Sequence, residues 1–166
     1  MLENKNIVLY GGAGLIGKEF VKAIKKNNGN VIVIDKISYD DWKKLDIFSD
    51  LYISADITSE KDVFNNINTI ANSFENIDAV VNTTFPKTKD WGKHFFDIDY
   101  SDFVENITIQ IGSSFIISRL YAKYFRDQGF GNIINIGSIQ GVVAPKFDTY
   151  YGTDMTQPPM YSIVKS

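Results

Sequence analysis

The chain has 166 residues, of which 44% are hydrophobic, and its 17 Lys and Arg against 20 Asp and Glu give a net charge of −3 at pH 7. This size fits one globular domain of roughly 100 to 150 residues, so we expect a single domain over residues 1–166. The slightly acidic balance argues against nucleic acid as a main partner. No apolar run approaches the roughly 18 residues of a membrane span and no leader is recognisable, so we expect a cytoplasmic protein with no membrane partner.

Cysteine is absent and His94 is the single histidine. These counts exclude disulfides, thiolate nucleophiles and cysteine or multi-histidine metal sites within the chain. A serine–histidine triad would also need an unusual base. We therefore expect no metal site, and chemistry that uses an organic cofactor or Tyr, Lys, Ser and carboxylate side chains.

Short β-branched runs alternate with longer helical patterns, which is typical of βαβ units around a parallel sheet. Ligands of such sheets bind beyond the carboxyl ends of the strands, so functional residues are expected there. A short helix at most is predicted for residues 39–47. The predicted strands cover residues 6–10, 31–34, 51–54, 79–82 and 132–136, and the predicted helices cover residues 15–28, 60–74 and 101–127.

A glycine-rich loop follows the first predicted strand. Gly11, Gly14 and Gly17 form a GxxGxxG pattern, and Leu15 and Ile16 stand at the start of the next helix. Glycine allows backbone to turn tightly and to approach a diphosphate, while the helix N-terminus offers free N–H groups and a positive dipole end. The order of strand, loop and helix favours a dinucleotide site over a plain glycine-rich turn.

Three polar residues follow other predicted strands. Asp35 ends the second strand, 18 positions after Gly17, close to the offset at which an acid binds adenosine ribose hydroxyls. A carboxylate there repels a 2′-phosphate and favours NAD over NADP, unless Asp35 is only a solvated acid. Asp56, followed by Ile57, is placed to accept a hydrogen bond from an adenine amine or to cap the next helix. Asn82 ends the fourth strand.

A YxxxK pair follows the fifth strand. Tyr161 and Lys165 would share one face of a helix, and a nearby lysine lowers the pKa of a phenol and helps it to exchange protons. The motif is common by chance and occurs again at Tyr39 and Lys43, so position decides between the two copies. Ser138 also follows the fifth strand, ahead of Tyr161.

The motifs together resemble the short-chain dehydrogenase/reductase family over nearly the whole chain. The resemblance implies a Rossmann-type α/β fold, a three-layer α/β/α sandwich with a doubly wound parallel sheet of strand order 3-2-1-4-5 and the later strands missing. It implies that Ser138, Tyr161 and Lys165 are catalytic, and that Tyr161 and Lys165 also contact the cofactor. Gln110 then stands where the family has a fourth catalytic residue, usually Asn.

Two departures from the family pattern bear on the substrate. Leu15 replaces the usual middle glycine, which makes the loop resemble the branch that modifies nucleotide sugars. A long polar and aromatic segment, residues 148–160, precedes Tyr161 and is either a substrate-recognition loop or a surface excursion. With the glycine loop, this segment resembles flagellin-modification oxidoreductases of legionaminic-acid pathways. This implies a sugar, sugar phosphate or nucleotide-sugar substrate.

We therefore predict an NAD(P)-dependent oxidoreductase that acts on a sugar-like alcohol or ketone. Two alternatives stay open: a non-catalytic dinucleotide-binding protein, and a nucleotide-sugar epimerase or dehydratase. The resemblance also implies a homo-oligomer formed through the predicted helix 101–127. Because the chain ends one residue after Lys165, it looks truncated, and we expect residues 1–166 alone to be inactive or nearly so.

Overall fold

The computed structural model describes residues 1–88, 91–144 and 146–166. Within it the chain divides into two compact units. The first unit comprises Met1–Thr84 and Ser113–Asn135, and the second comprises Phe85–Gly112 and Ile136–Ser166. The chain leaves the first unit just after the fourth strand and again just after the fifth, where functional loops were expected.

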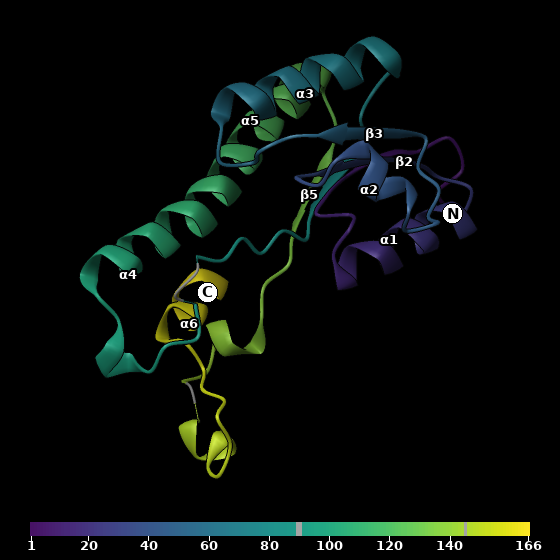
Figure 1. The fold of residues 1–166 in the computed structure, drawn as a ribbon. Helices are drawn as coiled ribbons and strands as arrows, with labels where there is room; N and C mark the ends of the chain where they lie inside the picture. Colours follow the sequence, from purple (N-terminus) through teal and green to yellow (C-terminus); the bar gives the residue numbers. More distant parts are fainter. Residues whose placement is uncertain (89–90, 145) are drawn as a thin grey trace. The chain divides into compact units, whose positions relative to one another are not determined.

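The first unit contains a five-stranded parallel sheet (Figure 1). Its strand order is β3-β2-β1-β4-β5, which confirms the predicted topology. Residues of the central strand β1 pair with β2 on one side and β4 on the other. The strands are β1 (Asn6–Tyr10), β2 (Asn30–Asp35), β3 (Leu51–Ser54), β4 (Ala79–Asn82) and β5 (Asn132–Asn135).

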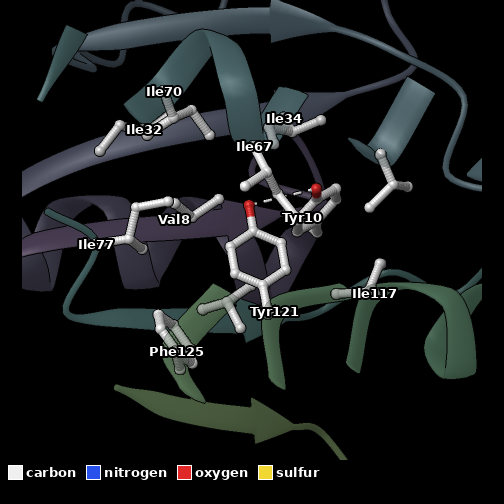
Figure 2. Packing of buried hydrophobic residues seen from close by; sticks show 12 residues of the cluster. Val8, Tyr10, Ile32, Ile34, Ile67, Ile70, Ile77, Ile117, Tyr121 and Phe125 are labelled. Carbon is white, nitrogen blue, oxygen red and sulfur yellow. Dashed lines mark hydrogen bonds between the residues drawn. The ribbon is translucent and has the colours of Figure 1, made fainter. Parts of the chain in front are cut away.

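Helices cover both faces of this sheet, so the unit has three layers and two cores. α1 (Leu15–Lys26) and α2 (Tyr39–Lys43) pack on one face, and α3 (Glu60–Ser73) and α5 (Ser113–Gln128) pack on the other. Strand β1 is buried along its whole length because alternate side chains enter the two cores. Figure 2 shows the second core, in which Tyr10 and Val8 of β1 meet Tyr121 and Ile117 of α5.

Local chemistry sets the helix ends. The Ser59 side chain accepts a hydrogen bond from the Asp62 backbone N–H at 3.3 Å, which caps the start of α3. Gly129 ends α5 in a left-handed conformation, with φ of +93°, and its N–H donates to the Phe125 carbonyl at 2.8 Å.

The second unit is mainly helical. α6 (Pro159–Lys165) packs against α4 (Tyr100–Ile107) and against the 3₁₀ turn η3 (Ile139–Gly141). The unit also contains two further 3₁₀ turns, η1 (Phe95–Asp97) and η4 (Phe147–Tyr150), and a π turn, η2 (Thr108–Gly112). Among the helices of the described ranges, none is both long and apolar enough to cross a bilayer.

The predicted helix over residues 101–127 is present, but a π turn interrupts its α-helical geometry. The structure has α4, then the π turn η2, then α5. Ile111 and Phe115 are 40% and 61% exposed, because they lie on the side of the helix away from its buried positions. The buried positions instead follow the spacing Asn106, Gln110, Ser113, Ile117, Tyr121 and Phe125.

Candidate functional site

The glycine loop between β1 and α1 is tightly closed on itself. Gly11 has φ of +83°, and a Cβ there would lie 2.9 Å from Thr83 Oγ1. Gly14 N–H donates to the Gly11 carbonyl at 3.1 Å. A Cβ on Gly17 would collide with that same carbonyl. The loop therefore requires glycine at positions 11 and 17 for its own geometry, before any ligand binds.

The N-terminus of α1 is open to a ligand. Gly14 is its N-cap, so no side chain caps the helix, and its first turn carries no acidic residue. Leu15 and Ile16 lie on the surface, 90% and 53% exposed. The backbone N–H groups and the positive end of the 12-residue helix suit a phosphate group, so the chain's own residues fit the diphosphate of a dinucleotide.

Asp35 links the end of β2 to the glycine loop. Its carboxylate accepts a hydrogen bond from Ala13 N at 2.9 Å and another from Lys36 N at 2.7 Å. The side chain is half-buried, at the carboxyl edge of the sheet. Its oxygens retain free acceptor capacity for ribose hydroxyls, because a carboxylate has about four lone-pair sites. Asp35 is thus placed where the sequence predicted it, with an added structural contact.

Asp56 follows β3, and Asn82 is the last residue of β4. Asp56 is exposed and accepts from the Thr58 backbone N–H and hydroxyl at 2.9 and 2.8 Å. Ser59 caps α3, so the alternative that Asp56 is this cap was wrong. Ile57 packs against the core beside it. Buried Asn82 accepts from Thr84 and donates to Ser114 and Asn135 at 3.2 and 3.3 Å, which joins β4 to β5 and α5.

The four predicted catalytic residues all belong to the second unit. Half-buried Ser138 is the N-cap of η3, and its hydroxyl accepts from Gln140 N at 3.2 Å. Gln110 lies in the π turn η2 and is 5% exposed. Tyr161 and Lys165 lie on α6, which packs against both α4 and η3. The predicted YxxxK helix is confirmed.

Lys165 is held by a backbone carbonyl of its own unit. Its ammonium donates to the Ile136 carbonyl at 2.8 Å. Burial lowers the pKa of this ammonium below its ordinary value. The same ammonium lies 4.8 Å from the centre of the Phe85 ring, and the Tyr161 ring meets Phe85 edge to face at 5.5 Å.

The sequence analysis did not identify Phe85 as a site residue. It could have been found as an aromatic residue three positions after Asn82, beyond the carboxyl end of β4. The second YxxxK copy is different, because Lys43 forms an ion pair with Asp40 at 2.9 Å and its ammonium lies 4.8 Å from the centre of the Tyr39 ring. That copy is a surface feature of α2.

Among the described residues, no group of three or more acidic or histidine side chains could hold a metal ion. The first unit offers backbone N–H groups and the Asp35 and Asp56 carboxylates, and the second offers hydroxyls and the half-buried Lys165 ammonium. This chemistry suits an organic dinucleotide and a proton-exchanging reaction.

A family model for short chain dehydrogenases matches residues 5–154. The chain belongs to this family. The match spans the first unit except its first four residues, and most of the second unit, including the glycine loop and Ser138. A short chain dehydrogenase has an NAD(P)-dependent oxidoreductase fold, so the parallel sheet and the open α1 N-terminus have a common explanation.

Two named relatives differ in what their names say. Post-translational flagellin modification protein A of Campylobacter coli is 35% identical over all of this chain and 68% of its own length. A 7alpha-hydroxysteroid dehydrogenase of Bacteroides fragilis is 30% identical over 90% of this chain and 60% of its own length. The chain thus spans about two thirds or less of the length of these relatives.

Solved structures of the family share the fold. A short chain dehydrogenase of Leptospira borgpetersenii with bound NAD+ superposes with a TM-score of 0.80 at 24% identity, over 99% of this chain and 61% of that one. ElxO with NADP bound superposes with a TM-score of 0.78 at 23% identity, over 97% of this chain and 62% of that one. The shared fold therefore accommodates either nicotinamide cofactor.

Proposed function

We propose that this protein transfers hydride between a nicotinamide cofactor, NAD in preference to NADP, and a small sugar-like alcohol or ketone. The observation that carries the proposal is α6 of the second unit, where Tyr161 and Lys165 stand four residues apart in a short chain dehydrogenase chain. The flagellin-modification name of the Campylobacter relative and the exposed segment around Tyr151, which is 94% exposed, support a sugar-like substrate.

Each predicted residue has a definite role in this reaction. The glycine loop would hold the diphosphate and Asp35 the adenosine ribose, with Asp56 and Ile57 near adenine. When bound, the nicotinamide supplies or accepts the hydride. Tyr161 donates a proton to the substrate oxygen in reduction and accepts it in oxidation, while the Ser138 hydroxyl hydrogen-bonds that oxygen. Lys165 would hold the nicotinamide ribose, and Gln110 would assist proton relay.

Asp35 carries the expected preference for NAD. We expect saturable NADH binding that is at least tenfold tighter than NADPH binding, measured by energy transfer from Trp42 and Trp91 to the nicotinamide. Asp35→Asn is the matched variant, because an amide oxygen can still accept from Ala13 N while the negative charge is gone. It should bind NADPH more tightly than the parent does. Folded protein that binds neither nucleotide would contradict the proposal.

The substrate class needs its own experiment. A panel of sugars, sugar phosphates, nucleotide sugars and one steroid alcohol, assayed by the change in NADH absorbance, separates the classes that the two relatives represent. If residues 1–166 show no turnover, the same panel is assayed on a form of the protein extended past Ser166. Turnover of the steroid alone would contradict a sugar-like substrate. Cytoplasmic location stays a prediction.

A further inference from the structure

Two aromatic rings, Phe85 and Trp91, pack against Tyr161 of the predicted catalytic pair in the second unit. The ring centres of Phe85 and Trp91 lie 5.1 Å apart, and Tyr161 lies 5.5 Å from Phe85 and 6.4 Å from Trp91. All three contacts are edge to face, an arrangement that aromatic side chains favour. The phenol of Tyr161 is therefore packed by rings from the segment that follows β4.

The same Phe85 ring also contacts the lysine. The Lys165 ammonium lies 4.8 Å from its centre, within the roughly 6 Å range of a cation–π interaction. The Lys87 ammonium lies 5.5 Å from that centre as well. Tyr161 and Lys165 share one face of α6. Phe85 contacts both of them from outside that helix.

The i, i+4 spacing on a helix fixes the backbone positions of two residues, but it leaves the ends of their side chains free to move. Lysine has a flexible four-carbon stem, so its ammonium needs partners if it is to stay in one place. Here the ammonium has two partners of different kinds, the Ile136 carbonyl at 2.8 Å and the Phe85 ring. The carbonyl accepts a hydrogen bond from one N–H of the ammonium, and the ring attracts the positive charge without a hydrogen bond.

We propose that Phe85 is a positioning residue for the reaction, whose ring holds the Tyr161 phenol and the Lys165 ammonium in one arrangement. This inference rests on the proposed function, because that function gives Tyr161 and Lys165 their roles. It adds a residue that acts through the catalytic pair, and it depends on the electrons of the ring rather than on the volume that the ring fills.

The variant Phe85→Leu tests whether Phe85 acts through the electrons of its ring or only through the volume that it fills. Leucine fills much of the same space and keeps Lys165 away from water, but it has no π face to attract a cation. The pKa of Lys165 should therefore fall further below its ordinary value than in the parent, as followed by NMR of labelled lysine. Phe85→Tyr keeps a ring and should restore the parent titration. Phe96→Leu, at a 94% exposed ring of the same segment, is the matched control.

Binding supplies the functional readout. In Phe85→Leu, NADH should bind about two- to fivefold more weakly, the loss expected when a partly exposed cation–π contact no longer fixes Lys165. ADP lacks the nicotinamide ribose, and its affinity should not change. Phe85→Tyr should bind NADH as the parent does, a rescue that space-filling alone would not require. If circular dichroism shows that the leucine variant is unfolded, Phe85→Met replaces it.

The outcomes are distinct from those that test the function itself. If the parent binds no NADH, the proposed function fails, whatever the lysine titration shows. If the parent binds NADH but Phe85→Leu matches it in Lys165 titration and in NADH affinity, Phe85 only fills space and the inference is overturned. Equal losses in Phe85→Leu and Phe96→Leu would overturn it too.

Discussion

Gly17 has no room for a side chain. A Cβ there would collide with the Gly11 carbonyl oxygen and would lie 2.8 Å from Gly12 Cα, and both neighbours are backbone atoms that no rotamer change can move. The glycine pattern indicated a site where a diphosphate approaches the backbone closely. At this position the backbone of the loop itself makes the close approach, so the requirement exists in the free protein.

Gly17→Ala should destabilise the fold by about 1 to 3 kcal/mol, the usual cost of overpacking, and should also weaken ADP and NADH binding because the loop must shift. Urea unfolding and nucleotide titration measure the two effects. Gly112→Ala is the control, since a Cβ there meets nothing within 4 Å. Equal stability of the two variants would contradict this account of the loop.

The Asp50 carboxylate contacts two distant parts of the chain. Its carboxylate forms an ion pair with Lys25 at 2.8 Å and accepts from the Val31 backbone N–H at 2.7 Å. We expect Asp50→Ala to cost about 1 to 3 kcal/mol, because the partly buried N–H loses its acceptor. Lys25→Ala should cost at most about 1 kcal/mol, because it removes only a surface ion pair. Urea unfolding of both variants tests this order, and the reverse order would contradict it.

At the scale of elements, α5 is anchored to the sheet by a pair of buried tyrosines. The hydroxyls of Tyr121 and Tyr10 lie 3.4 Å apart, and their rings meet edge to face (Figure 2). Burial raises the pKa of both phenols above the ordinary value. The packing of α5 on β1 therefore depends on both phenols staying neutral.

This gives stability a definite pH dependence. Both folded-state pKa values are raised, so the stabilisation is complete below the unfolded pKa of about 10 and is lost as pH rises above it, where the unfolded chain releases protons first. Urea unfolding between pH 8 and 11 should show stability falling above pH 10. Tyr121→Phe should have a shallower fall, because one phenol is gone. An unchanged slope in that variant would contradict the assignment.

The interrupted helix shows what periodicity alone misses. The phase of the buried apolar residues Ile117, Tyr121 and Phe125 continues backwards through buried polar positions, with Gln110 inside the π turn and Asn106 before it. A prediction that follows apolar side chains alone would bury Phe115, which is 61% exposed. Extending the phase of α5 toward its N-terminus would have found the buried amides.

For the whole molecule, the division into units separates the predicted roles. The glycine loop, Asp35 and Asp56 lie in the first unit, and Ser138 and Tyr161 lie in the second. The expected homo-oligomer stays a prediction. It is testable by sedimentation, with Phe115→Ser as the variant, because Phe115 is 61% exposed on α5.

Tyr161→Phe should separate catalysis from binding. The variant removes one hydroxyl from the second unit, so ADP affinity should stay within about twofold of the parent and NADH should still bind. Turnover should fall by at least 100-fold, because proton transfer by a placed side chain contributes on the order of 10² to 10⁴. Nucleotide titration and the NADH assay measure the two quantities. Unchanged turnover would favour another acid, and lost ADP binding would favour misfolding.

The sequence by itself determined the βαβ alternation, the strand order through its family resemblance, the glycine loop and the position of the YxxxK helix. Apart from the strand order, each of these follows from local periodicity, from glycine chemistry or from spacing along one element. Tertiary structure decided the π turn, the Asp35 contact with Ala13, and the Phe85 ring against Tyr161 and Lys165. These depend on contacts between residues far apart in the chain, and such contacts exist only once the backbone has folded.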